Sequence, residues 1–269
     1  MPELPEMETY KRLLEQKILF KPIQEIEINR EKSINTTPSA FINQVKGSHI
    51  YKIERRAKHL LFYLHNQQVL LLHLMLGGYM FLGFPEQKPD RTTQVELNFG
   101  GLVLYFIGLR LGYLHLYKEQ EIAHTLKALG PEPLAASFTF EEYKNTFEKK
   151  RGVLKSTLVN QQLISGIGNC YSDEICFDAG LLPMRKINEL SIEEHRLLYQ
   201  SIQQVLETAI SYGGYMEAPL FVGDELTGGY NAECLVYDRE GEPCHRCSSP
   251  IIRDEITSRK SFYCTGCQR

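Results

Sequence analysis

The sequence has no long hydrophobic run. Its longest apolar stretch, Val69–Leu76, is interrupted by His73 and is far shorter than the ~20 residues that a membrane-spanning helix needs. No basic-then-apolar leader opens the chain, so we do not expect secretion. Contact with a membrane is therefore not expected. The compartment should be reducing, which argues against structural disulfides among the seven cysteines.

Internal repeats and low-complexity tracts are also lacking. The hydrophobic content of 43% and the charged content of 23% are ordinary for a folded globular protein. A chain of 269 residues can bury a sizeable core, either as one large domain or as two smaller ones.

The chain has no surplus of positive charge. Its net charge is -3, whereas nucleic-acid binders are usually basic. Local charge matters more than the total, because attraction to phosphate decays over about 8 Å at physiological salt. Basic residues gather in three clusters, which either bind phosphate or are only solvated faces: Lys52, Arg55, Arg56 and Lys58; Lys149, Lys150, Arg151 and Lys155; and Arg239, Arg246, Arg253, Arg259 and Lys260.

The order of the sequence patterns predicts an α+β protein of two domains. Residues 5–18 predict a helix, and the stretch 24–118 predicts strands separated by Gly and Pro. Gly130–Pro133 breaks the composition, and helical periodicity follows, with capping boxes at Thr139 and Ser191. A short cysteine-rich segment, predicted as β, ends the chain. We therefore expect segments at 1–130, 131–233 and 234–269.

Four cysteines near the end of the chain have the spacing of a metal site. Cys244 and Cys247 are separated by two residues, as are Cys264 and Cys267, and 16 residues lie between the pairs. Each close pair suits a tight turn that directs two thiolates at one tetrahedral ion. The alternative is four unrelated thiols. Four thiolates would fill the coordination of a zinc ion, so we expect one structural Zn²⁺.

The chain begins Met1-Pro2-Glu3-Leu4-Pro5-Glu6, which is an unusual set of reactive groups. If Met1 is removed, Pro2 presents a secondary amine, and an amine beside carboxylates suits Schiff-base chemistry on a carbonyl such as an opened sugar. Glu3 and Glu6 are three residues apart and can share one helix face. They could also be ordinary acids at the start of a helix.

A glycine-rich turn before a predicted helix gives a third signal. Gly166 and Gly168 would let the backbone approach a phosphate, and Asn169 could cap the helix that follows. A plain turn between two helices would have the same pattern.

Together, in this order, these signals resemble the formamidopyrimidine-DNA glycosylase / endonuclease VIII family of base-excision repair enzymes. The resemblance is carried by Pro2–Thr9, Arg55–Leu60, Lys155–Pro183, Val236–Cys244 and the four cysteines. It implies an N-terminal β-sandwich with a flanking helix, then a helix–two-turn–helix domain and a zinc finger. The implied partner is double-stranded DNA with a damaged base or an abasic site. We expect a monomer that acts at the nucleoid in the cytoplasm of a bacterium.

The resemblance also implies a bifunctional DNA glycosylase and AP lyase. The Pro2 nitrogen would attack C1′ of a nucleotide flipped out of the duplex, release its base and lead to strand cleavage. Glu3 would be the acid that helps to open the sugar ring, Glu6 would hold the proline end, and Lys58 would contact DNA near the lesion. The positions expected to contact phosphates are Arg110, Lys155, Asn169 and Arg259.

The chain departs from the family where a Met, an Arg and a Phe fill the emptied duplex. Leu76, Leu109 and Leu111 stand at those positions. A leucine has no hydrogen-bond donor, so selection of the opposite cytosine should be weak, and activity on 8-oxoguanine does not carry over from the family. The three leucines hold the gap open as apolar wedges, or else Leu109 and Leu111 pack in a core and the loop has lost this function. The lesion-covering loop is expected within 216–224, and it indicates no particular lesion.

A second function remains open, a DNA-binding protein that recognises abasic, damaged or distorted DNA without excising bases. The lost triad and the net charge favour it. The retained Pro2, Glu3, Glu6 and Lys58 favour the enzyme, because a pure binder has no need of them. A zinc-ribbon module for protein–protein contact leaves the N-terminus unexplained.

Overall fold

The computed structural model describes residues 1–269, which form two compact units. The first combines Met1–Lys127 with Tyr212–Gly229, and the second combines Ala128–Ser211 with Tyr230–Arg269. This division differs from the three predicted segments. The chain returns to the first unit because Leu220 is buried in its core and accepts a hydrogen bond from Leu82 N (2.6 Å).

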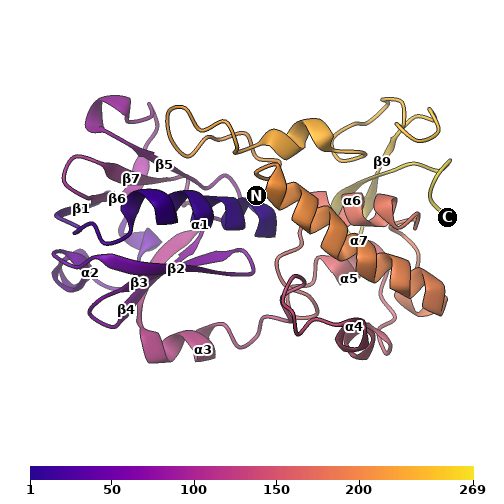
Figure 1. Ribbon diagram of the computed structural model, residues 1–269, viewed down its shortest axis with the longest axis horizontal. Coiled ribbons are helices and arrows are strands. Elements are labelled where there is room, and N and C mark those ends of the chain that lie inside the picture. Colours follow the sequence, from indigo (N-terminus) through magenta and orange to yellow (C-terminus); the bar gives the residue numbers. More distant parts are fainter. The chain divides into compact units, whose positions relative to one another are not determined.

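The first unit contains two four-stranded antiparallel sheets (Figure 1). One has the order β1 (Glu25–Ile28), β6 (Thr93–Asn98), β7 (Val103–Ile107) and β5 (Tyr79–Gly83). The other has the order β2 (Ile50–Arg56), β3 (His59–Leu64), β4 (Gln68–His73) and β8 (Tyr113–Lys118). The helices of this unit are α1 (Leu4–Ile18), α2 (Pro38–Val45) and α3 (Ile122–Thr125).

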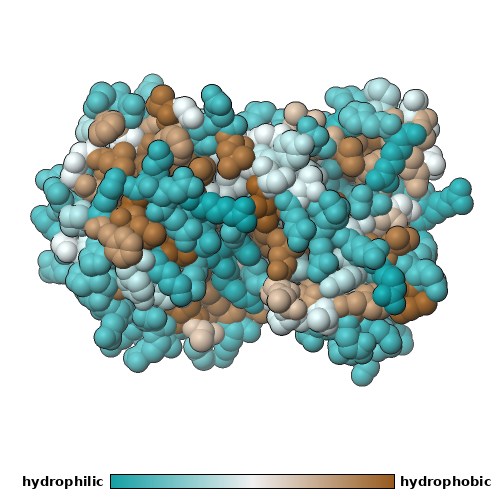
Figure 2. Space-filling model, in the orientation of Figure 1, coloured by the Kyte–Doolittle hydropathy of each residue, from teal (hydrophilic) through white to brown (hydrophobic).

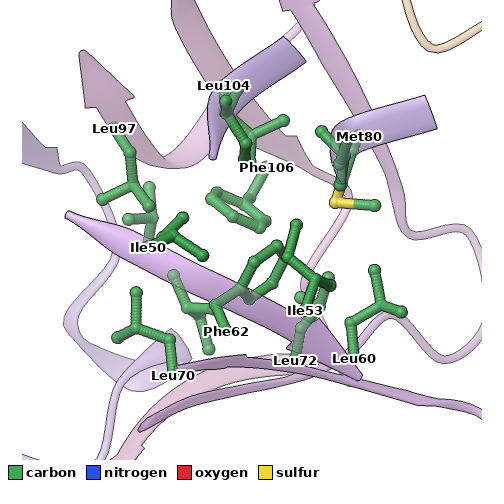
Figure 3. Packing of buried hydrophobic residues seen from close by; sticks show 14 of the residues in the cluster. Ile50, Ile53, Leu60, Phe62, Leu70, Leu72, Met80, Leu97, Leu104 and Phe106 are labelled. Atoms are coloured by element: carbon green, nitrogen blue, oxygen red, sulfur yellow. The ribbon is translucent and has the colours of Figure 1, made fainter. Parts of the chain in front are cut away.

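The core of this unit lies between the two sheets. In Figure 3, Phe62 and Leu72 of one sheet face Leu104 and Phe106 of the other, and all four side chains are buried. Alternate strand positions supply this layer, because successive side chains of a strand point to opposite faces. Helix α1 packs beside β2 and β3, and its outward face is hydrophilic in Figure 2.

The second unit is mainly helical, with α4 (Phe140–Phe147), α5 (Leu154–Leu158), α6 (Asn169–Asp178) and α7 (Ile192–Ser211), and with one hairpin of β9 (Ile252–Ile256) and β10 (Arg259–Tyr263). The two predicted capping residues precede α4 and α7. Thr139 Oγ1 accepts from Glu142 N (3.3 Å), and Ser191 Oγ accepts from Glu194 N (3.2 Å). No helix in residues 1–269 is both long and apolar enough to span a bilayer.

Two neighbouring acids of α6 hold the C-terminal segment on this unit, and both are fully buried. The carboxylate of Glu174 accepts backbone hydrogen bonds of 2.8–2.9 Å from the three N–H groups of residues 235–237. Asp173 accepts from Ser261 Oγ (2.6 Å) and from Phe262 N (3.1 Å) on β10. Burial raises the pKa of Asp173 to about 6, while Lys155 and these donors oppose the rise.

We expect Glu174→Ala to lower the free energy of unfolding by about 3 kcal/mol or more, because each buried N–H left without a partner costs ~1–3 kcal/mol. Urea unfolding followed by circular dichroism measures the loss. Glu189→Ala is the matched control, since Glu189 is exposed and paired only with Lys186 (3.6 Å). Equal stability of the two variants would contradict the role given to Glu174.

Candidate active site

The start of α1 is organised by two buried carboxylates. Glu3 is the N-cap residue, and Glu6 stands three residues later in the first turn. Glu6 Oε2 accepts from Glu3 N (2.7 Å), and Glu6 Oε1 accepts from Tyr215 N (2.8 Å). Both glutamates are 1% exposed. Gly214 lies against this carboxylate, where a Cβ would come within 2.3 Å of Glu6 Oε1.

Pro2 is buried immediately before this helix, while Met1 is exposed. The amino group of Met1 donates to the Tyr215 hydroxyl (3.3 Å), and that hydroxyl donates to the Met1 carbonyl (3.2 Å). With Met1 attached, the Pro2 nitrogen is an amide whose lone pair is delocalised, so it cannot attack a carbon. Removal of Met1 would leave a secondary amine next to Glu3.

Lys58 lies in the two-residue turn between β2 and β3 and is 5% exposed. Ala57, the other residue of this turn, has a positive φ of 54°. Arg55 donates to the Ala57 carbonyl (3.3 Å) and to Glu8 Oε2 (3.0 Å), which ties this hairpin to α1. Burial alone would raise the pKa of Glu8, but Arg55 and neighbouring cations lower it, so Glu8 remains a carboxylate in this ion pair.

The three leucines at the positions expected to fill the emptied duplex differ in their exposure to solvent. Leu109 is fully buried in the core, its N–H donates to Gln94 Oε1 (2.9 Å), and its carbonyl accepts from Arg30 (3.3 Å). Leu76 and Leu111 are 68% and 63% exposed. Leu109 therefore packs in the core, as the second of the two interpretations expected, whereas Leu76 and Leu111 lie at the surface.

The two loops that carry these exposed leucines pack against each other through their backbones. A Cβ on Gly108 would lie 2.1 Å from the Gly77 carbonyl oxygen, and one on Gly112 would lie 2.5 Å from the His73 carbonyl oxygen. Only glycine permits this approach. The loops 74–78 and 107–112 are therefore held as one surface feature. An open pocket of about 1080 Å³ adjoins them, lined in part by Leu76, Arg91 and Arg110.

The expected lesion-covering loop is fixed at its base in the first unit. Asp224 Oδ2 accepts from Leu220 N (2.8 Å) and from Thr227 Oγ1 (2.6 Å). Val222, between them, is 68% exposed. The tip of the loop is thus presented to solvent while both flanks are hydrogen-bonded.

In the second unit, the structure does not support the predicted phosphate contact of Lys155. The side chain is fully buried, with Nζ 2.7 Å from Asp173 Oδ1 and 2.8 Å from the Asn169 carbonyl oxygen. The ammonium group therefore neutralises a buried carboxylate instead of facing solvent. The spacing of the basic cluster could not reveal this, because charge alone does not show where a lysine points.

Unlike Lys155, neither Asn169 nor Arg259 is held in a buried ion pair, so both stay candidates for phosphate contact. Asn169 is the first residue of α6, whose N-cap is Gly168 and not Asn169 as expected. Its Oδ1 is buried and lacks a hydrogen-bond partner within the chain. Arg259 is exposed at the start of β10, two residues before Ser261, which bonds to Asp173. The network of Lys155 and Asp173 thus supports both of these positions.

The four cysteines of the C-terminal segment converge as their spacing predicts. Their sulfur atoms all lie within 4.8 Å of one another. Cys244 Sγ is 3.8 Å from Cys267 Sγ, and Cys247 Sγ is 3.4 Å from Cys264 Sγ. Four thiolates bound to one tetrahedral zinc at ~2.3 Å would be separated by about 3.8 Å, so the cluster fits such an ion. These cysteines could therefore hold a metal.

Sequence reasoning missed the residues that position the site. Tyr215, Gln94 and Asp173 contact predicted site residues across 15 or more positions of sequence. No local spacing rule links such distant positions. A weak signal was present in Asp173-Glu174, because these two adjacent acids stand directly before the apolar run Ile175–Phe177 and need partners if they are buried.

Known proteins match both units of the chain. The family profile for the formamidopyrimidine-DNA glycosylase N-terminal domain matches residues 1–113, and the profile for the H2TH domain of that enzyme matches residues 129–218. The formamidopyrimidine-DNA glycosylase of Desulfitobacterium hafniense is 35% identical over 272 residues, with both chains fully covered. That of Carboxydothermus hydrogenoformans is 35% identical over 271 residues, also with full coverage.

Solved structures agree with these matches. The Lactococcus lactis Fpg bound to DNA containing N7-benzyl-Fapy-dG has a TM-score of 0.92 at 29% identity, with full coverage of both chains. The same bacterium's Fpg bound to abasic-site DNA has a TM-score of 0.92 at 29% identity, with 99% of each chain covered. The chain therefore belongs to the formamidopyrimidine-DNA glycosylase family and is a DNA glycosylase of base excision repair.

Proposed function

We propose that this enzyme excises a damaged base from double-stranded DNA and then cleaves the strand through the amine of Pro2. The Pro2 nitrogen attacks C1′ of the flipped nucleotide, and the bond from C1′ to the base breaks as the base leaves with a proton. The sugar ring then opens: the C1′–O4′ bond breaks, O4′ takes up a proton, and C1′ and the Pro2 nitrogen form an iminium. Loss of a proton from C2′ of this iminium then expels the 3′ phosphate. The buried carboxylates that follow Pro2 carry this proposal.

The hydrogen bonds divide the two glutamates between two roles. Both oxygens of Glu6 accept backbone N–H bonds, so Glu6 is held as a carboxylate that fixes the proline end. Glu3 is the residue next to Pro2 and is shielded from solvent. We therefore assign to Glu3 the proton transfer that opens the sugar ring, and to Lys58 a contact with the DNA beside the lesion.

Borohydride trapping on abasic-site DNA tests the nucleophile. Wild-type protein whose Met1 has been removed, as checked by intact mass, should give a covalent protein–DNA adduct. We expect Pro2→Gly to lower the trapping rate by about tenfold, equivalent to ~1.4 kcal/mol in the barrier. Pro5→Ala is the control, because it changes the neighbouring turn and keeps the Pro2 amine. No adduct from processed wild-type protein would leave DNA binding without excision as the function.

The two exposed leucines support a separate proposal on selectivity. Leu76 and Leu111 are carried by loops whose backbones are locked together, so they can enter the space left by a flipped nucleotide as apolar wedges. Neither side chain can donate a hydrogen bond to the opposite base. Leu109, in the position of the family's base-reading Arg, is buried in the core.

We expect cleavage of one lesion opposite each of the four bases to differ by less than about fivefold, because the ~1–3 kcal/mol of a base-reading contact is missing. Single-turnover rates on four duplexes measure this. Leu111→Ala should slow all four reactions together. Leu197→Ala controls for the loss of an exposed leucine elsewhere, since Leu197 is 50% exposed on α7. A strong preference for cytosine would refute the proposal.

We infer that the metal of the four-cysteine cluster is a structural Zn²⁺, supported by the fit of the sulfur separations. The ion would crosslink the segment that carries Arg259 and so stabilise its fold. Four thiolate ligands would leave it no open coordination position. We also propose that Arg110, Asn169 and Arg259 contact DNA phosphates. Because the proposed substrate is double-stranded DNA, we expect the enzyme to act at the nucleoid.

Metal analysis of purified protein tests this assignment. We expect about one zinc per wild-type chain and a large loss of zinc in Cys247→Ala, because three thiolates bind the ion less tightly than four. Cys234→Ala is the matched control, since Cys234 is a buried thiol outside the cluster. Full zinc content in Cys247→Ala would contradict the four-thiolate site.

A further inference from the structure

Three aromatic side chains lie in a row where the second sheet of the first unit ends. His59 of β3 pairs in register with His73 of β4, and His73 pairs with Tyr113 of β8. The ring centroids are 4.2 Å apart for the two histidines and 5.7 Å apart for His73 and Tyr113. We call His59, His73 and Tyr113 the aromatic row.

Each member of the aromatic row borders one of the loops already described. His59 is the first residue of β3 and follows Lys58 directly. His73 is the last residue of β4 and precedes the loop of Leu76. Tyr113 is the first residue of β8 and follows the loop of Leu111. The row therefore connects the origins of the lysine turn and of both leucine loops.

Two hydrogen bonds of the His59 ring link Tyr113 to the Arg56 carbonyl. His59 Nδ1 lies 3.3 Å from the Arg56 carbonyl oxygen, and His59 Nε2 lies 3.2 Å from the Tyr113 hydroxyl oxygen. A carbonyl oxygen can only accept, so in the neutral ring Nδ1 carries the proton and Nε2 accepts from the hydroxyl. The His59 ring thus bonds across the turn that carries Lys58 and links this turn to Tyr113 at the start of β8.

His73 fills the space between these two side chains as an uncharged ring. Burial, followed by smaller electrostatic effects of His59 and Lys58, lowers the pKa of His73 to about 3. Its carbonyl oxygen is the atom that Gly112 approaches closely. The middle of the row is therefore packed against the backbone of the Leu111 loop.

We propose that His59 and Tyr113 are positioning residues that fix Lys58 relative to Leu76 and Leu111. The inference rests on the proposed function of those three residues. Through the row, the side chains that enter the duplex and the lysine beside the lesion move as one rigid body. Neither His59 nor Tyr113 needs to touch DNA in this role.

The decisive variant is Tyr113→Phe, which removes one hydroxyl and leaves the ring. Its matched control is Tyr117→Phe, because Tyr117 is on the same strand with its hydroxyl 3.4 Å from His115 Nδ1 and away from the lysine turn. We expect Tyr113→Phe to lower the single-turnover excision rate about fivefold with unchanged DNA affinity, while the melting temperature falls only by the roughly 2–4 °C that the loss of one net hydrogen bond predicts. Tyr117→Phe should match the wild type.

A double-mutant cycle separates positioning from simple stabilisation. In a Leu111→Ala background, Tyr113→Phe should have less effect on the rate than in the wild type, since the wedge that it aligns is already missing. Equal effects in both backgrounds, or equal rates for Tyr113→Phe and Tyr117→Phe, would overturn the inference. Wild-type protein that forms no trapped adduct would instead overturn the proposed function, and this inference with it.

Discussion

The structure depends on one requirement, that a carboxylate taken out of water must be given hydrogen-bond donors. An unsatisfied buried charge costs several kcal/mol, so each such group dictates the chain around it. The carboxylate of Glu6 accepts hydrogen bonds from the N–H groups of both Glu3 and Tyr215. Asp173 and Glu174 do the same for the C-terminal segment. In each unit, distant stretches of sequence meet at an acid.

The same requirement explains why two cationic residues have structural roles. Lys155 compensates Asp173 in the interior, and Arg55 joins α1 to the lysine turn through Glu8. A basic residue in a DNA-binding protein is easily taken for a phosphate ligand. The bonding partner separates the two roles here, because Lys155 Nζ is 2.7 Å from the buried carboxylate of Asp173 and is taken up by that ion pair.

Much of the fold could be predicted from local patterns. Helix α1 lies close to its expected range, and strands β1 to β8 all lie within 24–118, because apolar alternation and turn residues report directly on burial. The starts of α4 and α7 could be predicted from their capping residues, Thr139 and Ser191. The cysteine cluster followed from spacing, since tetrahedral geometry restricts the turns that can satisfy it.

Other features could not be predicted, because they depend on contacts distant in the sequence. Nothing around Leu109 indicates that Gln94 and Arg30 pull its backbone inward and bury its side chain. Asn169 resembles a helix cap, yet the tight turn gives that position to Gly168. The return of 212–229 to the first unit is likewise fixed by Leu220 in a core built far away in the sequence.

The contact between Met1 and Tyr215 has a consequence for when the Pro2 amine becomes available. A newly made chain has its first residue docked on the Tyr215 hydroxyl and carries no free amine at Pro2. Under the proposed mechanism such a chain lacks its nucleophile, because the Pro2 nitrogen is part of a peptide bond. Removal of the exposed Met1 would then free the Pro2 nitrogen and the tyrosine hydroxyl in the same event.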